Sequence, residues 1–374
     1  MSDYYIGIMT GTSLDAIDIA LVEFADTPLL IASDSVPLSD KLKQGLSDIS
    51  LPNAQIESLI AIKMLEQSYT NSVIAALDLF LANPEVENLR SNIKAIGLHG
   101  VTVSHEPNLP MPFTWQLVDG HKVAAALNLD VVYDFRSKDV ALGGQGAPLV
   151  PMFHYSVFKD VGLDIAVLNL GGIANVTKWA SKDNIIGFDT GPANTLLDFW
   201  IQKQQNLAYD KGGQWASSGN VNKALLNYLL DEDYFHQPYP KSTGKEYFNE
   251  SWLNAKLALF LKNNTPLHSQ DVQATLVQLT VESVVLAIKQ LAEIKVLAVC
   301  GGGVHNQFLI ARLAAALPKV EVCSTAKFGI CPDNMEAMAF AWLAKCRIDN
   351  IPATLPTITG TSKPAVLGAW VSSA

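Results

Sequence analysis

Charged residues are scarce in the sequence, and acidic residues outnumber basic ones. Asp and Glu total 36 against 26 Lys and Arg, which gives a formal net charge of −10, and charged residues make up 17% of the chain. No block of like charges offsets this balance, so the chain lacks the basic surface that attracts nucleic acids or anionic membranes. We therefore expect neither a nucleic acid nor a membrane as a partner.

Cysteine is also rare. The four cysteines are Cys300, Cys323, Cys331 and Cys346, and their spacing fits neither CxxC pairs nor a disulfide framework for a chain of this length. Reduced thiols are typical of cytoplasmic proteins. The first five residues contain no basic segment before an apolar run, which predicts no signal peptide. We expect a cytoplasmic location.

Long uncharged hydrophobic runs are few. The most informative one, residues 140–158, contains three glycines, two prolines, a glutamine and a histidine, which do not make a membrane span. Hydrophobic residues nevertheless make up 49% of the 374 residues, enough for a substantial core. At roughly 150 residues per domain, this length predicts two domains or one large α/β unit.

Several familiar catalytic motifs are missing. The sequence has no GxxxxGK[ST] phosphate loop, no HRD and DFG pair of the protein kinases, no HExxH and no GxSxG. His99, His105 and His154 are isolated from one another, which disfavours a zinc site.

The hydrophobic pattern indicates an α/β protein. It predicts strands at residues 4–10, 17–24, 29–36, 93–98, 129–134, 164–170, 185–189 and 295–300. It predicts helices at 41–49, 55–81, 192–205, 270–291, 306–317 and 334–348, with Pro192 at the first helical position of the third. The polar, glycine-rich stretch 209–248 is interpreted as loops around one helix at 221–230.

One internal similarity is specific. Residues 6–11 (IGIMTG) align with residues 186–191 (IGFDTG), 180 positions further on. Such matches also arise by chance, because strands followed by Thr-Gly are common. Both copies lie where a strand meets a turn, and we favour two related α/β domains that face each other. The predicted domains are residues 1–135 plus about 358–374, and residues 136–357.

Three predicted strands end in glycine-rich turns, at residues 10–15, 190–192 and 301–303. Backbone N–H groups in such turns bind phosphate without a lysine, and a helix N-terminus favours an anion. The third turn lets a flat ring or a ribose approach the backbone closely. A single glycine turn after a strand usually serves only to connect two secondary-structure elements. Three in one chain favour a nucleotide held between two domains.

Ordered motifs run along nearly the whole chain: MTGTSLDAID at 9–18, GLHGVT at 97–102, DFR at 134–136 with Asp139, GGQGAPLVP at 143–151, NLGGIAN at 169–175, FDTGPAN at 188–194, KSTG at 241–244 and CGGGVHN at 300–306. In these motifs the chain resembles the anhydro-N-acetylmuramic acid kinases of the sugar kinase/Hsp70/actin superfamily. Ala16 stands where the family usually has glycine, and Val101 where it usually has glutamine.

The resemblance implies a fold and an activity. The fold would be α/β, with two related RNase H-like (actin-like ATPase) domains and a central interdomain cleft. The activity would be that of an ATP-dependent kinase with Mg²⁺, which opens 1,6-anhydro-N-acetylmuramic acid with water and phosphorylates O6. The products, N-acetylmuramic acid 6-phosphate and ADP, belong to peptidoglycan recycling and amino-sugar catabolism.

The resemblance also implies site residues. Asp189 would be the catalytic base, although an aspartate before a helix is more often only a capping residue. The ATP-binding residues would be Gly11, Thr12, Ser13, Leu14, Asp15, Ala16, Ile17, Asp18, Thr190, Gly191, Gly301, Gly302 and Gly303. Asp15 would contact Mg²⁺, or would instead satisfy amides of its own turn.

The predicted sugar-binding residues are His99, Thr102, Arg136, Asp139 and Glu336. An arginine fork suits the lactyl carboxylate of the sugar, but a structural salt bridge from Arg136 to Asp134 or Asp139 is an equal alternative. Glu336 begins a helix, where an acid is favoured in any case. The KSTG segment would close over the substrate or form an ordinary surface turn.

Two other functions stay open on the sequence alone. One is a related kinase with a different substrate, since the superfamily combines one ATP-binding arrangement with different pockets. The other is a non-catalytic ATP-dependent binder or sensor, for which a base at Asp189 would be unnecessary. The oligomeric state is undetermined, and a homodimer is one option.

Overall fold

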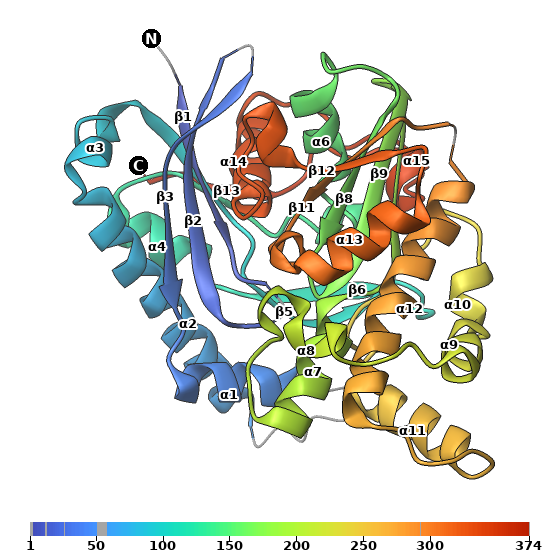
Figure 1. Ribbon diagram of the computed structural model, residues 1–374. Coiled ribbons are helices and arrows are strands. Elements are labelled where there is room, and N and C mark those ends of the chain that lie inside the picture. Colours follow the sequence, from blue (N-terminus) through green and yellow to red (C-terminus); the bar gives the residue numbers. More distant parts are fainter. Residues whose placement is uncertain (1–2, 12, 26, 51–57, 292, 374) are drawn as a thin grey trace. The chain divides into compact units, whose positions relative to one another are not determined.

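The computed structural model describes residues 3–373 except 12, 26, 51–57 and 292 (Figure 1). The start of the predicted helix at 55–81 and Thr12 therefore lie outside the described residues. The chain divides into two compact units. Unit 1 comprises Met1–Phe158 and Asn334–Ala374, and unit 2 comprises Lys159–Asp333.

Unit 1 holds eight strands and eight α-helices among its described residues. The strands are β1 (Tyr4–Met9), β2 (Ala16–Phe24), β3 (Pro28–Pro37), β4 (Ile93–Leu98), β5 (Val101–Glu106), β6 (Phe113–Leu117), β7 (Val131–Tyr133) and β13 (Ala369–Val371). The helices are α1 (Asp40–Ile49), α2 (Leu59–Leu81), α3 (Pro84–Glu87), α4 (Gly120–Leu127), α5 (Ser137–Ala141), α6 (Pro151–Phe158), α14 (Met335–Ile348) and α15 (Pro356–Thr359), with the 3₁₀ turn η1 (Arg90–Asn92).

Unit 2 holds five strands among its described residues: β8 (Ile165–Leu170), β9 (Ile173–Ser181), β10 (Asn184–Pro192), β11 (Val296–Cys300) and β12 (Glu321–Ser324). Its helices are α7 (Asn194–Gln205), α8 (Gln214–Ser217), α9 (Lys223–Leu230), α10 (Asp233–His236), α11 (Glu250–Leu261), α12 (Ser269–Lys289) and α13 (Gln307–Ala316). The 3₁₀ turns are η2 (Lys211–Gly213), η3 (Gly302–His305) and η4 (Thr325–Phe328).

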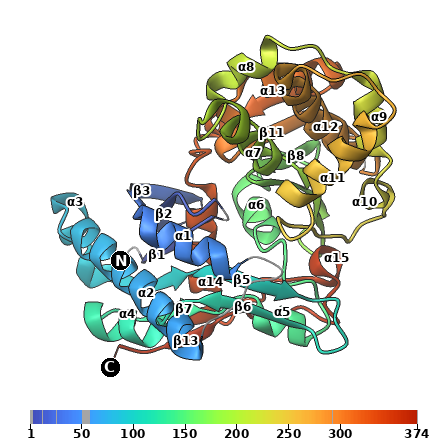
Figure 2. The same ribbon diagram turned by 90° about the horizontal axis from the view of Figure 1, so that it is seen from below.

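The main sheet of unit 1 has the strand order β13-β7-β4-β1-β2-β3. Strands β1, β2 and β3 form an antiparallel meander, whereas β4 and β7 run parallel to β1. Apolar side chains on one face, such as Ile6 and Ile8, join a core cluster with Tyr69 and Leu77 of α2 and Val123 of α4. A separate two-stranded sheet, β5–β6, lies beside α5 (Figure 2).

Helix α14 covers the opposite face of this sheet. A Cβ on Gly7 of β1 would lie 1.8 Å from the Ala337 carbonyl oxygen, and one on Gly97 of β4 would lie 2.0 Å from that of Phe340. Glycine is therefore required at both positions, because only its lack of a side chain lets the helix backbone rest directly on the strands. Gly7 and Gly97 thus determine where α14, a helix from the C-terminal part of the chain, packs on the sheet.

The placement of α14 alters the domain boundaries. The sequence predicted breaks after residues 135 and 357, whereas the compact units divide after residues 158 and 333. The predicted second domain included α14, but this helix packs on β1, β2 and β4 and so belongs to unit 1. Helices α5 and α6 fall in unit 1 for the same reason, since their contacts are made there.

The sheet of unit 2 repeats the arrangement of unit 1. Its order is β10-β9-β8-β11-β12, with β8, β9 and β10 as an antiparallel meander and β11 and β12 parallel to β8. Two related α/β domains, as the actin-like fold requires, are therefore confirmed. Strand β1 corresponds to β8 by topology, and these strands begin at residues 4 and 165.

The sequence similarity between residues 6–11 and 186–191 does not follow this repeat. It aligns β1, an inner strand of its sheet, with β10, an edge strand. The inference of two related domains was correct, but the alignment that suggested it was wrong. A match of six residues records only that both segments are strands followed by Thr-Gly.

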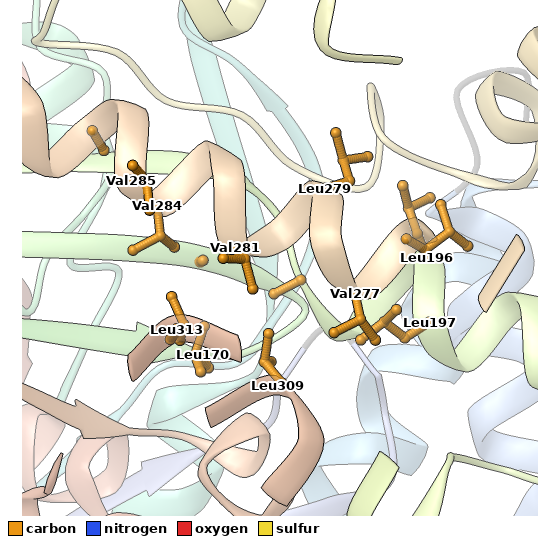
Figure 3. Close-up of a cluster of buried hydrophobic side chains, with 14 of the residues drawn as sticks. Leu170, Leu196, Leu197, Val277, Leu279, Val281, Val284, Val285, Leu309 and Leu313 are labelled. Atoms are coloured by element: carbon orange, nitrogen blue, oxygen red, sulfur yellow. The ribbon is translucent and has the colours of Figure 1, made fainter. Parts of the chain in front are cut away.

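The core of unit 2 gathers around α12. Helix α12 is long and apolar enough to cross a membrane by length and composition, but 83% of its most apolar window is buried within the structure. Figure 3 shows its residues Val277, Val281 and Val284 among side chains of β8, α7 and α13. The same apolar composition that suits a membrane span therefore serves a buried core helix, and among the described residues it is the one helix that passes this test.

Most predicted elements appear within a few residues of their expected bounds, with three differences. Pro192 is the last residue of β10, not the first of a helix, and α7 begins at Asn194. The stretch 209–248 contains α8 and α10 in addition to α9, which replaces the predicted helix at 221–230. The pattern also missed several elements, among them β5, β6, β9, α4, α6 and α11.

Candidate active site

In each unit, the predicted functional residues come after strands that run parallel to one another. In unit 1, β1, β4 and β7 are parallel and are followed by residues 10–15, His99 and Arg136. In unit 2, β8 and β11 are parallel and are followed by residues 171–172 and 301–303, and β10, which runs in the same direction, ends with residues 190–192. The carboxyl ends of such strands meet at one edge of a sheet, which is where open α/β sheets bind ligands. Each unit therefore has one candidate edge.

Asp189 lies near the end of β10 and is 6% exposed. Its carboxylate oxygen Oδ2 accepts a hydrogen bond from the Thr243 backbone N–H at 3.0 Å. Its own N–H donates to the Lys241 carbonyl at 3.2 Å, and its carbonyl accepts from the Tyr234 hydroxyl at 2.8 Å. Both the backbone and the carboxylate of Asp189 are therefore held by the segment that contains Tyr234, Lys241 and Thr243.

The alternative that Asp189 only caps a helix is wrong. The residue that precedes α7 is Ala193, which has no side chain to cap it. The first amides of the helix, those of Asn194 and Thr195, donate to the carbonyls of Gly171 and Gly172. We expected this helix N-terminus to face an anion, but these amides are used by the β8–β9 turn. The dipole argument for an ionised Asp189 therefore loses its basis.

A β-bulge comes directly after Asp189. Asp189 pairs with Asn175 and Gly191 pairs with Ala174, so Thr190 is the extra residue of β10. The Thr190 hydroxyl is buried and donates to the Ala174 carbonyl at 3.3 Å. Bulges of this kind re-aim side chains next to active sites. The bulge fixes the direction of Asp189, and the Thr190 side chain already has a structural partner.

Burial and the charge of Asp189 both affect the pKa values of two neighbouring residues, Lys241 and Tyr234. Burial lowers the pKa of Lys241 to about 8, and the negative charge of Asp189 opposes this shift. Burial raises the pKa of Tyr234, and Asp189 raises it further. The Lys241 ammonium donates to the Tyr234 carbonyl at 2.9 Å and lies 4.5 Å from the centre of the Tyr234 ring. The KSTG segment is thus an anchored part of the Asp189 environment, and the surface-turn alternative is wrong for Lys241, which is 7% exposed.

The triple-glycine turn comes after β11. Gly301 has φ +79°, and a Cβ there would lie 2.3 Å from Oδ1 of Asn169. A Cβ on Gly303 would lie 2.6 Å from Cβ of Leu170. Only Gly302 has space, since its nearest contact would be 4.0 Å away. Two of the three glycines are therefore explained by packing against β8, and Gly302 is the one with room for a ligand.

The residues of the predicted ATP-binding segment after β1 differ in how far they are exposed to solvent. Leu14 and Ile17 are buried in the core of unit 1, so only their backbone is available to a ligand. Leu14 has φ 57° and donates its N–H to the Gly11 carbonyl at 3.0 Å, which closes the turn. Ser13 is exposed, Gly11 and Ala16 are half-buried, and Thr12 lies outside the described residues. Asp18 accepts a hydrogen bond from the Ser35 hydroxyl at 2.6 Å.

Asp15 is the predicted contact for Mg²⁺. Its side chain is 66% exposed and forms an ion pair with Lys43. Within the described residues, no group of three or more His, Cys, Asp or Glu side chains is arranged to hold a metal ion. A single exposed carboxylate fits Mg²⁺ bound mainly through nucleotide phosphates and water, and does not fit a metal site built from protein ligands alone.

His99 and Arg136 are brought together in unit 1. Nε and Nη2 of Arg136 approach Nε2 of His99 at 3.2 and 3.0 Å, and Nη1 donates to the Gly146 carbonyl at 2.6 Å. His99 is 5% exposed, and its ring centre lies 4.8 Å from that of Phe340. Burial first, and then the Arg136 charge, lower the pKa of His99 well below its usual value. The sequence alternatives for Arg136, Asp134 and Asp139, are not the partners in these bonds.

Asp139 was predicted to bind the sugar, but the structure gives its carboxylate other partners. The residue is fully buried, and its two oxygens accept hydrogen bonds from the Gly146 N–H and from the hydroxyls of Thr354 and Thr359. A buried carboxylate with three protein donors is a structural group, so direct sugar binding by Asp139 is not supported.

Two further sugar candidates differ in their surroundings. Thr102 is half-buried in β5, and its hydroxyl accepts from Nε2 of Gln116 at 3.3 Å. Glu336 is half-buried in the first turn of α14. Burial raises the pKa of Tyr5 at the start of β1, and the charge of Asp349, directly after α14, raises it further, whereas a Cβ on Gly7 would lie 1.8 Å from the Ala337 carbonyl oxygen. The helix therefore runs antiparallel to β1, which brings Glu336 to the carboxyl edge of the sheet.

Sequence reasoning missed Tyr234 and the Gly171-Gly172 turn as parts of the site, and it singled out residues 241–244 without predicting the contact of Thr243 with Asp189. The turn could have been found, because it comes after a predicted strand as the other glycine turns do. Tyr234 lies in a polar stretch without periodicity, and Thr243 acts through its backbone N–H, which any residue except proline possesses. No side-chain pattern could have indicated either.

Comparison with known proteins shows the family to which the chain belongs. The sequence matches the family model described as anhydro-N-acetylmuramic acid kinase over residues 3–373. The chain belongs to this family. A relative named anhydro-N-acetylmuramic acid kinase from Haemophilus influenzae is 47% identical over 378 residues, covering 98% of this chain and 97% of the relative. Relatives of the same name from Pasteurella multocida and Shewanella sp. strain MR-4 are 46% and 45% identical over 373 residues.

The alignments with these two relatives also span nearly the whole length of both proteins. They cover 98% of this chain and 96% of the Pasteurella protein, and 99% of both this chain and the Shewanella protein. The resemblance inferred from the motifs is thereby confirmed. Val101, which departs from the family's usual glutamine, is 2% exposed in the core of unit 1, so its side chain serves packing.

Proposed function

We propose that this family member is an ATP-dependent kinase that opens 1,6-anhydro-N-acetylmuramic acid and phosphorylates O6, giving N-acetylmuramic acid 6-phosphate and ADP. The observation that carries this proposal is the match to the kinase family over residues 3–373. The reaction uses ATP, and it serves peptidoglycan recycling and amino-sugar catabolism in the bacterial cytoplasm.

The reaction balances with one base. A water molecule attacks the anomeric carbon and forms the new C1–O bond while a carboxylate removes its proton. The bond from C1 to O6 breaks, and O6 becomes the nucleophile that bonds to the γ-phosphorus. The bond between the γ-phosphorus and the β,γ-bridging oxygen then breaks, and ADP leaves. The protein has to position these groups and neutralise the charge that develops.

Asp189 is our candidate for the base. Three contacts from Tyr234, Lys241 and Thr243 hold its backbone and one carboxylate oxygen, which supports a fixed orientation. The charge of Asp189 acts on Lys241, because it opposes the lowering of the Lys241 pKa by burial. A positioned, ionised carboxylate is what proton removal from water requires.

The remaining roles divide between the two units. In unit 1, His99, Thr102, Arg136 and Glu336 contact the sugar, and residues 11–18 contact ATP, with Asp15 as the carboxylate toward Mg²⁺. In unit 2, Thr190, Gly191 and Gly302 contact ATP through their backbone. The Thr190 hydroxyl and the side-chain positions of Gly301 and Gly303 are occupied by packing, which supports backbone contacts. Bound Mg²⁺ would neutralise phosphate charge.

The test is a product assay. Purified protein is mixed with MgATP and the anhydro sugar, and ADP and sugar phosphate are quantified. We expect equal amounts of both products and no reaction without the sugar. ADP release that does not depend on the sugar would favour an ATP-dependent binder or sensor instead. Activity on another hydroxylated substrate, with none on the anhydro sugar, would favour a related kinase of different specificity.

A further inference from the structure

The buried Asp139 carboxylate joins three separate segments of unit 1. Oδ2 accepts the Gly146 N–H at 2.7 Å, while Oδ1 accepts the hydroxyls of Thr354 and Thr359 at 2.8 and 2.7 Å. A further bond ties the same segments, since the Gln145 N–H donates to the Thr359 carbonyl at 2.7 Å. The position of Gly146 therefore depends on Asp139.

Gly146 in turn fixes a functional candidate. Its carbonyl accepts Nη1 of Arg136 at 2.6 Å, so its N–H and its carbonyl link Asp139 to Arg136. A Cβ on Gly146 would lie 2.8 Å from Cγ2 of Val140 and 3.0 Å from Cε1 of His105, which shows how little room the loop has to shift. A guanidinium is rigid and planar, so one anchored nitrogen limits the direction of the other two.

The other two nitrogens determine the protonation of His99. Arg136 is always a donor, and its Nε and Nη2 both approach Nε2 of His99, which must therefore carry a lone pair. The neutral ring then carries its proton on Nδ1. This atom is buried. Burial and then the Arg136 charge lower the pKa of His99, which agrees with a neutral ring, although a backbone hydrogen bond to Gly100 opposes the shift.

We propose that Asp139 is a positioning residue, which acts through Gly146 and Arg136 to hold His99 as a neutral ring protonated on Nδ1. Arg136 and His99 are thereby held in a fixed arrangement for the sugar, while Asp139 itself does not touch the substrate. The part that concerns sugar binding rests on the proposed function. The hydrogen-bonded chain from Asp139 to His99 does not, because it exists without any ligand.

The first experiment examines His99 without substrate. Protein with ¹⁵N-labelled histidine is compared with Asp139→Asn and with the double variant Thr354→Val/Thr359→Val, and His99 is assigned through His99→Gln. We expect the unmodified protein to show an unprotonated Nε2, and both variants to show mixed tautomers or exchange broadening. Thr354→Ser/Thr359→Ser keeps both hydroxyls and should restore the original signal. An unchanged His99 signal in folded threonine variants would overturn the proposal, even where Asp139→Asn fails to fold.

The second experiment separates positioning from general damage. We expect the double valine variant to raise KM for the anhydro sugar about tenfold, the effect of weakening one good hydrogen bond, while KM for ATP changes less than about twofold. Asp78→Asn, an exposed carboxylate on α2 of the same unit, is the matched control. Equal losses for sugar and ATP would mean that Asp139 only stabilises the fold, and would contradict the proposal. Absence of activity in the unmodified protein would refute the proposed function, and the histidine signals would still decide the role of Asp139.

Discussion

The Thr243 backbone N–H donates to Oδ2 of Asp189 at 3.0 Å, across 54 positions of sequence. We expect Asp189→Asn to lower kcat by about 10²–10⁴-fold, because an amide cannot take a proton from water. Binding of ATP and of the sugar should persist, since the amide oxygen can still accept the Thr243 N–H. Steady-state kinetics and calorimetric titration with each ligand measure the two effects.

The control for this substitution is Asp183→Asn, an exposed aspartate in the turn between β9 and β10 of the same unit. It should leave kcat within about twofold, as is usual for surface changes. A near-normal kcat in Asp189→Asn would remove Asp189 as the base. Loss of both kcat and ligand binding would instead assign it a structural role.

Tyr234 supports the backbone of the same aspartate. Its hydroxyl donates to the Asp189 carbonyl at 2.8 Å, and the side chain is 5% exposed. Tyr234→Phe leaves that buried carbonyl without this donor, so we expect the free energy of unfolding to fall by about 1–3 kcal/mol. Denaturant titration measures the loss, and Tyr209→Phe, at an exposed position of unit 2, is the control. Equal stability of the two variants would show that the hydroxyl contributes nothing.

Lys241 makes the stability of the protein depend on pH. Burial lowers its pKa from 10.5 to about 8 in the folded state, so between pH 8 and 10.5 the unfolded chain binds more protons. The charged amine therefore costs stability below about pH 8, and this cost disappears as the pH rises toward 10.5. Lys241→Met removes the charge at every pH. Between pH 7 and 9.5, we expect the Tm of the original protein to rise relative to that of Lys241→Met. Each kcal/mol of stability recovered by deprotonation of Lys241 corresponds to roughly 2–4 °C in Tm.

Thermal unfolding of both proteins across this range provides the measurement, with Lys262→Met as a control for a lysine beyond the end of α11. Comparing two proteins at each pH cancels the titration of all groups that they share. A constant difference in Tm between Lys241→Met and the original protein would mean that Lys241 titrates as it does in the unfolded chain.

The sequence was informative wherever a functional segment comes directly after a strand. Short apolar runs predicted the central strands, and parallel neighbouring strands bring the residues at their carboxyl ends to one edge of the sheet. Residues 10–15, His99 and Arg136 can therefore be grouped from the pattern of strands. The same local reasoning failed for Pro192, because a proline suits both the end of a strand at a sheet edge and the start of a helix.

The contacts that define the roles of single carboxylates could not be predicted. Asp139 meets Thr354 and Thr359 across 215 and 220 positions, and only the fold brings these hydroxyls to it. A motif shows that an aspartate is present but not whether its oxygens are free for a ligand. For Asp139 the motif suggested sugar binding, whereas the contacts indicate an internal role.

The triple-glycine turn allows packing and nucleotide binding to be separated. Gly301→Ala should destabilise unit 2, because its φ of +79° disfavours a side chain and the new Cβ would lie 2.3 Å from Asn169. Gly302→Ala has no such conflict, since its Cβ would meet only Nδ2 of Asn194 at 4.0 Å. If ATP approaches the backbone here, Gly302→Ala should retain the original Tm and raise KM for ATP at least about tenfold, while KM for the sugar stays unchanged. An unchanged KM for ATP in this well-folded variant would mean that the triple glycine serves only to pack β11 against β8.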